Sequence, residues 1–131
     1  MMNSDTQSIT INVAPAKLFD FLTNPENLAR WASSLCQSVR KDGDQWLLQS
    51  KLGDLKLRIV SDKTFGVIDY HISPPLPMKF IAYSRIIPNG QASEFTFTQF
   101  QLPLLPASFF EKQKDSLKKE LSTLKDIMEK E

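Results

Sequence analysis

The last quarter of the chain sets the strongest limit on its fold. After Pro103 and Pro106, apolar residues recur at spacings of three, four or seven, and lysines and glutamates fill the positions between them. The apolar positions are Phe110, Leu117, Leu121, Leu124 and Met128. This spacing predicts an amphipathic helix of roughly five to six turns. Its stripe needs an apolar surface of matching length, and only the inner face of a sheet would be large enough.

The preceding residues have the pattern of such a sheet. Ile9, Ile11 and Val13 alternate with polar residues, which predicts a half-buried first strand. From Val39 to Gln101 we expect six more strands, separated by the turn-forming segments KDGD, LGDL, SDKTFG, SPPLP and PNGQ.

Two short helices are predicted between the first and second strands. Pro15 suits the first position of a helix, where its missing N–H costs nothing, and residues 18–22 supply an apolar stripe. Asn24 followed by Pro25 repeats this start signal, because the asparagine side chain can cap a second helix that carries Trp31. The break lets the chain turn a corner.

Pairing residues across the turns tests which side chains share a face. We place two-residue loops at Gly53-Asp54, Lys63-Thr64 and Asn89-Gly90. The resulting pairs include Leu52 with Leu55, Leu48 with Ile59, Leu57 with Tyr70, Ser84 with Phe95, Arg58 with Asp69, and Arg85 with Glu94. The last two would be ion pairs on the outer face, and the apolar pairs would share the inner face.

The predicted inner face is rich in large apolar side chains. On the strands it comprises Trp46, Leu48, Leu57, Ile59, Ile68, Tyr70, Phe80, Phe95, Phe97 and Gln99, and these residues face Phe110, Leu117, Leu121 and Leu124 of the last helix. Tyr70, Ser84 and Gln99 are its polar groups, and buried polar groups need partners. This surface is either a filled core or the lining of a ligand cavity.

Composition narrows the function classes. A formal charge of +1 gives no electrostatic reason to expect a nucleic-acid or anionic-membrane partner. One cysteine and one histidine cannot form a metal cluster without scattered carboxylates, no glycine-rich phosphate loop is present, and we expect no metal or cofactor. No apolar run has the length of a membrane span, and the amino terminus lacks a signal-peptide pattern. We therefore expect one cytoplasmic domain over residues 1–131.

The element order and several motifs carry a family resemblance. The opening ITINVAPAKLFDFLTNPENLARWA is similar to the amino-terminal signature of polyketide cyclase and dehydrase-like proteins, with Leu18 at the usual valine and Asn24 or Asn27 in place of an acidic residue. FGVIDYHI and SRIIPNGQASEFTF are similar to uncharacterised bacterial members. The chain thus resembles the START-like (SRPBCC) superfamily, which includes lipid-transfer domains and the birch-pollen allergen group. The resemblance implies an α+β helix-grip fold, in which a curved seven-stranded antiparallel sheet is covered by a long carboxy-terminal helix.

The superfamily hosts several functions on this fold, so three hypotheses follow. The first is binding of a small apolar or aromatic molecule between sheet and helix, by Trp46, Leu57, Tyr70, Phe80, Ser84, Phe95, Phe97, Gln99, Leu117 and Leu121. The second is a cyclase- or aromatase-like enzyme that uses polar groups of the cavity. The third is a protein interaction module, similar to chaperone activators, that uses Ile81, Tyr83 and Phe100 on the convex face. Ligand identity and oligomeric state stay open.

Asp69 and His71 are the candidates for a catalytic pair, because an aspartate can orient a histidine base. The predicted register places both on the outer face near Arg58, where solvation explains them; a β-bulge would turn them inward. Cys36 has no histidine near it in the sequence and is interpreted as a structural thiol.

Overall fold

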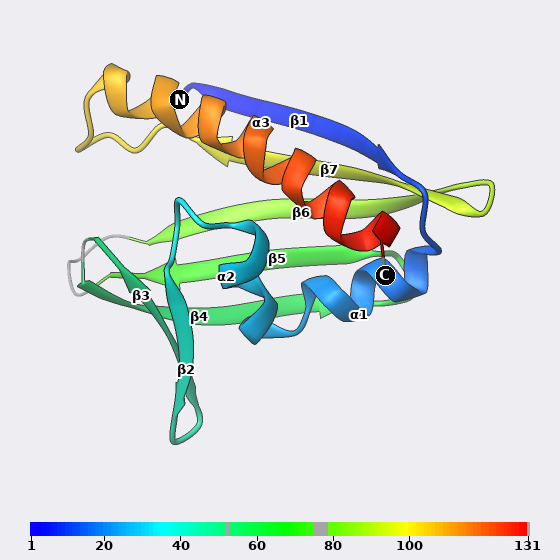
Figure 1. Cartoon of the computed structure of the whole chain (residues 1–131). Coiled ribbons are helices and arrows are strands. Elements are labelled where there is room, and N and C mark those ends of the chain that lie inside the picture. Colours follow the sequence, from blue (N-terminus) through cyan, green and yellow to red (C-terminus); the bar gives the residue numbers. More distant parts are fainter. Residues whose placement is uncertain (52, 75–78, 131) are drawn as a thin grey trace.

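The computed structural model describes residues 1–51, 53–74 and 79–130, and it has the helix-grip architecture (Figure 1). A curved, antiparallel seven-stranded sheet has the order β1-β7-β6-β5-β4-β3-β2. Its strands are β1 (Ser4–Ile11), β2 (Ser38–Asp42), β3 (Gln45–Ser50), β4 (Gly53–Asp62), β5 (Val67–Ser73), β6 (Phe80–Asn89) and β7 (Ala92–Phe100). The helices are α1 (Pro15–Leu22), the 3₁₀ turn η1 (Pro25–Asn27), α2 (Leu28–Trp31) and α3 (Ala107–Lys130). The helices lie on the concave side of the sheet, and α3 runs beside β1 (Figure 1). The predicted fold class is confirmed.

The broken helix pair forms as the sequence predicts. Pro15 occupies the start of α1, and the side chain of Asn24 accepts a hydrogen bond from the backbone N–H of Glu26 at 3.2 Å. Pro25 opens a 3₁₀ turn rather than a full helix, and α2 then adds one short turn that ends at Trp31. The chain therefore changes direction within a few residues and presents Trp31 to the concave face.

The predicted faces of the sheet are confirmed. Along β5, Ile68, Tyr70 and Ile72 are buried, whereas Asp69 and His71 between them are half-buried on the other face. The same holds for β6, where Ser84 and Ile86 are buried while Tyr83, Arg85 and Ile87 are exposed. Alternate side chains along each strand thus point either to a buried concave face or to a more solvent-exposed convex face.

The predicted registers are wrong at all three hairpins. Leu48 lies opposite Leu55 rather than Ile59, Leu57 opposite Ile72 rather than Tyr70, and Ser84 opposite Phe97 rather than Phe95. The two predicted ion pairs fail with them, because Arg58 lies opposite His71 and Arg85 opposite Thr96. The predicted pair of Leu52 and Leu55 involves Leu52, which is outside the described residues.

Turn chemistry explains two of these shifts. Gly90, with φ +59°, opens the β6–β7 loop, and Asn89 pairs with Ala92 inside the ladder; the predicted type I′ turn would require a positive φ at Asn89, which does not occur. At the β4–β5 turn, the side chain of Asp62 accepts hydrogen bonds from the N–H groups of Thr64 and Phe65, at 2.9 and 3.3 Å. The turn therefore spans four residues, Lys63 to Gly66, instead of two.

Helix α3 completes the core and is attached to the edge strand β1. It has 24 residues, about one turn more than the sequence predicted, and all five residues of its predicted stripe are buried. Lys125 Nζ donates to the carbonyl of Thr10 at 2.7 Å, and the Asn12 N–H donates to Glu129 Oε2 at 2.8 Å. These contacts also partner backbone groups at the end of an edge strand, which limits pairing with other chains there.

Candidate ligand-binding site

Rows of side chains cross the concave face from strand to strand. In one row the middle members are buried and the outer members are half-buried: Trp46, Leu57, Ile72 and Phe80. The neighbouring row repeats this pattern with Ile59, Tyr70 and Ala82. The third row, toward the other end of the sheet, contains Ile68, Ser84, Phe97 and Gln7.

Five apolar side chains of β3, β4, β6 and β7 pack against the core but keep part of their surface exposed. They are Trp46, Ile59, Phe80, Ala82 and Phe97, here called the half-buried set. Elsewhere on the face, α1, α2 and α3 complete the cover, and Leu57, Tyr70 and Phe95 are at most 6% exposed. The half-buried set is the part of the concave face where a ligand would bury further apolar surface.

The ten predicted ligand-binding residues lie on the concave face or on the side of α3 that covers it. Six are buried, namely Leu57, Tyr70, Ser84, Phe95, Leu117 and Leu121. Four are half-buried, namely Trp46, Phe80, Phe97 and Gln99. The structure therefore gathers them on one side of the sheet, but it presents only the second group toward solvent.

The hydroxyl groups on this face already have partners. Tyr70 Oη donates to the carbonyl of Leu22 at 2.9 Å, and Ser84 Oγ donates to the carbonyl of Ile68 at 2.6 Å. Burial raises the pKa of Tyr70 well above its ordinary value, because the phenolate would be poorly solvated there. Both groups act as structural donors that tie the sheet to α1 and to itself.

Gln99 belongs to a hydrogen-bonded cluster whose other two side chains, Asp5 and Gln7, the sequence reasoning missed. Its Nε2 donates to Asp5 Oδ2 at 3.1 Å, and Gln7 Nε2 lies 2.8 Å from the same oxygen and 3.0 Å from the carbonyl of Lys114 on α3. Asp5 and Gln7 precede the apolar alternation that identified the first strand, so that signal gave no reason to select them. This network joins the beginning of β1 to the first half of α3.

The indole N–H of Trp31 is a further polar atom that the sequence reasoning missed. Its side chain is 3% exposed and packs edge-on against Phe95 and Phe97, with ring centroids 6.4 and 6.5 Å apart. Of the buried side-chain nitrogen and oxygen atoms in the described residues, Trp31 Nε1 is the one without a hydrogen-bond partner. The sequence identified Trp31 only as an apolar residue of the second helix, although a buried indole N–H ordinarily finds an acceptor.

Two hollows lie outside the predicted site. One, of about 580 Å³, lies between the amino-terminal residues, Gln101 and the first turns of α3, and Phe110 and Lys114 contribute to it. The other, of about 350 Å³, lies between α1, the β4–β5 turn and β6. Neither is lined by any of the ten predicted ligand-binding residues.

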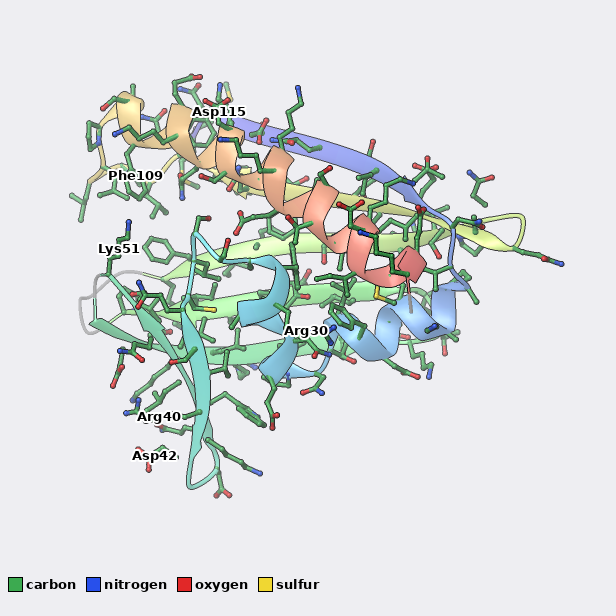
Figure 2. The ribbon with its side chains drawn as sticks, viewed as in Figure 1. Arg30, Arg40, Asp42, Lys51, Phe109 and Asp115 are labelled. Atoms are coloured by element: carbon green, nitrogen blue, oxygen red, sulfur yellow. The ribbon has the colours of Figure 1, made fainter. Side chains whose placement is uncertain are left out.

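Figure 2 shows the side chains at one end of the molecule, where Phe109 of α3 and Lys51, which follows β3, are labelled. It also labels Arg40 and Asp42 on the edge strand β2.

The candidate catalytic pair lies on the convex face. Asp69 and His71 alternate with the buried Tyr70, and their neighbours in the ladder are Val60 and Tyr83 for Asp69, and Arg58 and Ile81 for His71. The bulge that would have turned them inward does not occur in β5, whose pairing with β4 is continuous. Within the described residues, no group of three or more His, Cys, Asp and Glu side chains could hold a metal ion.

Glu120 of α3 is half-buried and contacts the segment after α2, near the buried Cys36. Glu120 Oε2 accepts hydrogen bonds from the backbone N–H and the hydroxyl of Ser34, at 3.2 and 2.9 Å. Burial, reinforced by the nearby carboxylate, raises the pKa of the Cys36 thiol to about 11. A thiol with a raised pKa is a poor nucleophile, which supports a structural role.

Solved structures with the same fold are numerous, although their sequences differ widely. The chain is similar to XoxI from Bacillus cereus, with 15% identity, a TM-score of 0.76 and coverage of 97% of this chain and 96% of that one. It is similar to the Aha1 dimer from Colwellia psychrerythraea, with 16% identity, a TM-score of 0.77 and coverage of 98% and 97%. A START superfamily protein from Mycobacterium smegmatis gives 10% identity, a TM-score of 0.73 and 97% coverage of both chains.

Among the described helices, none combines the length and the apolar character that a membrane crossing requires.

Of the two sequence comparisons, one gave a match. A search of curated proteins gave none. The family model for polyketide cyclase / dehydrase and lipid transport matches residues 2–129, nearly the whole chain, which confirms the START-like resemblance. The chain therefore belongs to the polyketide cyclase / dehydrase and lipid transport family.

Proposed function

We propose that this protein binds a small apolar or aromatic molecule on the concave face, against the half-buried set. The carrying observation is that these five apolar side chains pack on the core from four strands and still keep exposed surface. Membership of a family that includes lipid transport proteins agrees with a site for an apolar ligand. The free, buried thiol of Cys36 fits the cytoplasm as the proposed compartment.

Apolar burial would supply most of the affinity. A two-ring aromatic molecule that removes about 250 Å² of apolar surface from water gains roughly 6 kcal/mol at about 25 cal/mol per Å². A gain of 6 kcal/mol alone would correspond to a dissociation constant of about 40 μM, and association itself costs free energy, so we expect dissociation constants of about 0.1 to 1 mM for simple aromatic probes.

A fluorescence titration with the polarity-sensitive naphthalene ketone prodan tests this proposal. Ala82→Phe adds a ring to the middle of the half-buried set and is expected to weaken prodan binding by roughly tenfold, because the probe and the new ring compete for one volume. Tyr83→Ala is the matched control, since the next residue along β6 points to the convex face and is 44% exposed. Equal binding by wild type and Ala82→Phe, with both folded by circular dichroism, would refute the assignment.

A second candidate function is protein docking on the convex face. Tyr83 and Val60 are 44% and 41% exposed, and the rings of Tyr83 and Phe100 meet edge-on at 6.2 Å. Val60 and Tyr83 lie on either side of Asp69, and contiguous exposed apolar patches mark interaction surfaces. Sedimentation of wild type and Tyr83→Ser at increasing concentration tests self-association there; an unchanged monomer in both would exclude a second copy as the partner.

Asp69 and His71 face away from the concave side, so we do not propose the enzyme alternative.

A further inference from the structure

Trp31 presents a polar atom that the fold leaves unused. The Nε1 group lies beneath the surface in a side chain that is 3% exposed, and it has no hydrogen-bond partner in the part of the chain that the structure describes. The buried hydroxyls on the same side of the sheet, Tyr70 and Ser84, both donate to backbone carbonyls. Trp31 therefore differs from its polar neighbours.

An unpartnered buried donor is unfavourable, so its position needs a reason. Leaving such a group without an acceptor costs about 1 to 3 kcal/mol relative to its solvated state. The indole ring reaches from α2 across the concave face to β7, where it contacts Phe97 edge-on. Phe97 is a member of the half-buried set, so the orphan N–H belongs to a residue directly beside the proposed binding surface.

We propose that Trp31 Nε1 donates a hydrogen bond to an oxygen atom of the bound molecule. This inference rests on the proposed function and narrows its ligand class. Because an indole N–H can only donate, it selects ligands that carry an acceptor, such as a ketone, ester or ether oxygen, on an otherwise apolar or aromatic body. A pure hydrocarbon of the same shape leaves the donor unpaired and gains only from apolar burial.

Two probes of nearly equal shape test the acceptor requirement. 2-Acetylnaphthalene carries a carbonyl where 2-isopropenylnaphthalene carries a C=CH₂ group. We define the preference as the dissociation constant of the isopropenyl compound divided by that of the acetyl compound, measured by NMR titration. Trp31→Phe removes the N–H but keeps an aromatic ring, and we expect it to lower this preference by about fivefold or more, in line with the loss of one hydrogen bond. Tyr83→Phe is the control: it also removes one polar hydrogen and keeps an aromatic ring, but it lies on the convex face and should leave the preference unchanged.

The indole proton of wild-type Trp31 gives a readout that does not depend on a variant folding. Its resonance, assigned from NOE contacts with the Phe95 and Phe97 rings, should move downfield with 2-acetylnaphthalene and not with 2-isopropenylnaphthalene. If both compounds bind but Trp31→Phe keeps the wild-type preference and the indole resonance responds alike to both, the inference is wrong while the proposed function stands. If neither compound binds to wild type, the proposed function fails and the inference fails with it.

Discussion

At Gly66 the β4–β5 turn lies close to the backbone of β6. Its φ is +69°, and a Cβ built on it would lie 2.3 Å from the carbonyl oxygen of Ile86 and 3.2 Å from its carbonyl carbon. The Ile86 N–H donates to the Gly66 carbonyl at 2.8 Å, so the two segments are held at this distance. Gly66→Ala must therefore move either the turn or the β6 backbone.

The size of the effect follows from two contributions. An alanine at a positive φ costs about 1 to 2 kcal/mol of conformational energy. Overpacking against a backbone atom that cannot rotate away adds about 1 to 3 kcal/mol. We expect Gly66→Ala to lower the free energy of unfolding by roughly 2 to 5 kcal/mol, a large share of the 5 to 15 kcal/mol typical of a domain.

Urea denaturation followed by tryptophan fluorescence measures this loss. Gly43→Ala is the control, because Gly43 also has a positive φ, +61°, but a Cβ there would meet nothing within 4 Å. Only the conformational cost applies to the control, so Gly66→Ala should be the more destabilised variant by at least about 1 kcal/mol. A Gly66→Ala protein as stable as Gly43→Ala would refute the close approach of the turn to β6.

Three further predictions concern the core and two titratable groups whose pKa is raised. Leu124→Ala should lower the free energy of unfolding in urea by about 2 to 5 kcal/mol, because this side chain is fully buried on the inner face of α3. Ser122→Ala is the control on the exposed face of the same helix and should change it by less than about 0.5 kcal/mol. Burial, opposed by the hydrogen bonds from Ser34, raises the pKa of the Glu120 carboxyl group. The folded protein therefore holds this proton more tightly than the unfolded chain does, and its stability falls as the pH rises above 4.5. Glu120→Gln should remove this fall, and an identical pH profile of the urea midpoint in both proteins would contradict it. With its pKa raised to about 11, the Cys36 thiol should react slowly with a disulfide reagent at pH 8 and quickly in urea, and rapid labelling of the folded protein would show that it is accessible.

For the strand residues that it assigned to a face, the sequence predicted the face correctly but not which residue lies opposite. Ser84 illustrates the difference: it was expected opposite Phe95 and lies opposite Phe97, two positions away. A shift by two residues keeps every side chain on its face, so apolar alternation cannot distinguish these registers. The turns choose among them, through local contacts such as the Asp62 side chain on Thr64 and Phe65.

The candidate site was predictable in its apolar part and less so in its polar part. Periodicity was sufficient to place Phe80, Phe97 and Leu121 around one surface. Whether a polar side chain is free to meet a ligand depends on which backbone carbonyl lies within reach, and this is a property of the folded chain. Tyr70 finds the carbonyl of Leu22, 48 positions away, whereas Trp31 finds none.

The most direct test of the central claim is the location of a bound aromatic probe. Methyl groups of neighbouring residues on β4 and β6 report on both faces: Ile59 and Ala82 belong to the half-buried set, and Val60 and Ile81 alternate with them toward the convex face. In a ¹³C methyl NMR titration with 2-acetylnaphthalene, we predict saturable shifts at Ile59 and Ala82 and little change at Val60 and Ile81. Shifts confined to Val60 and Ile81 would contradict binding on the concave face.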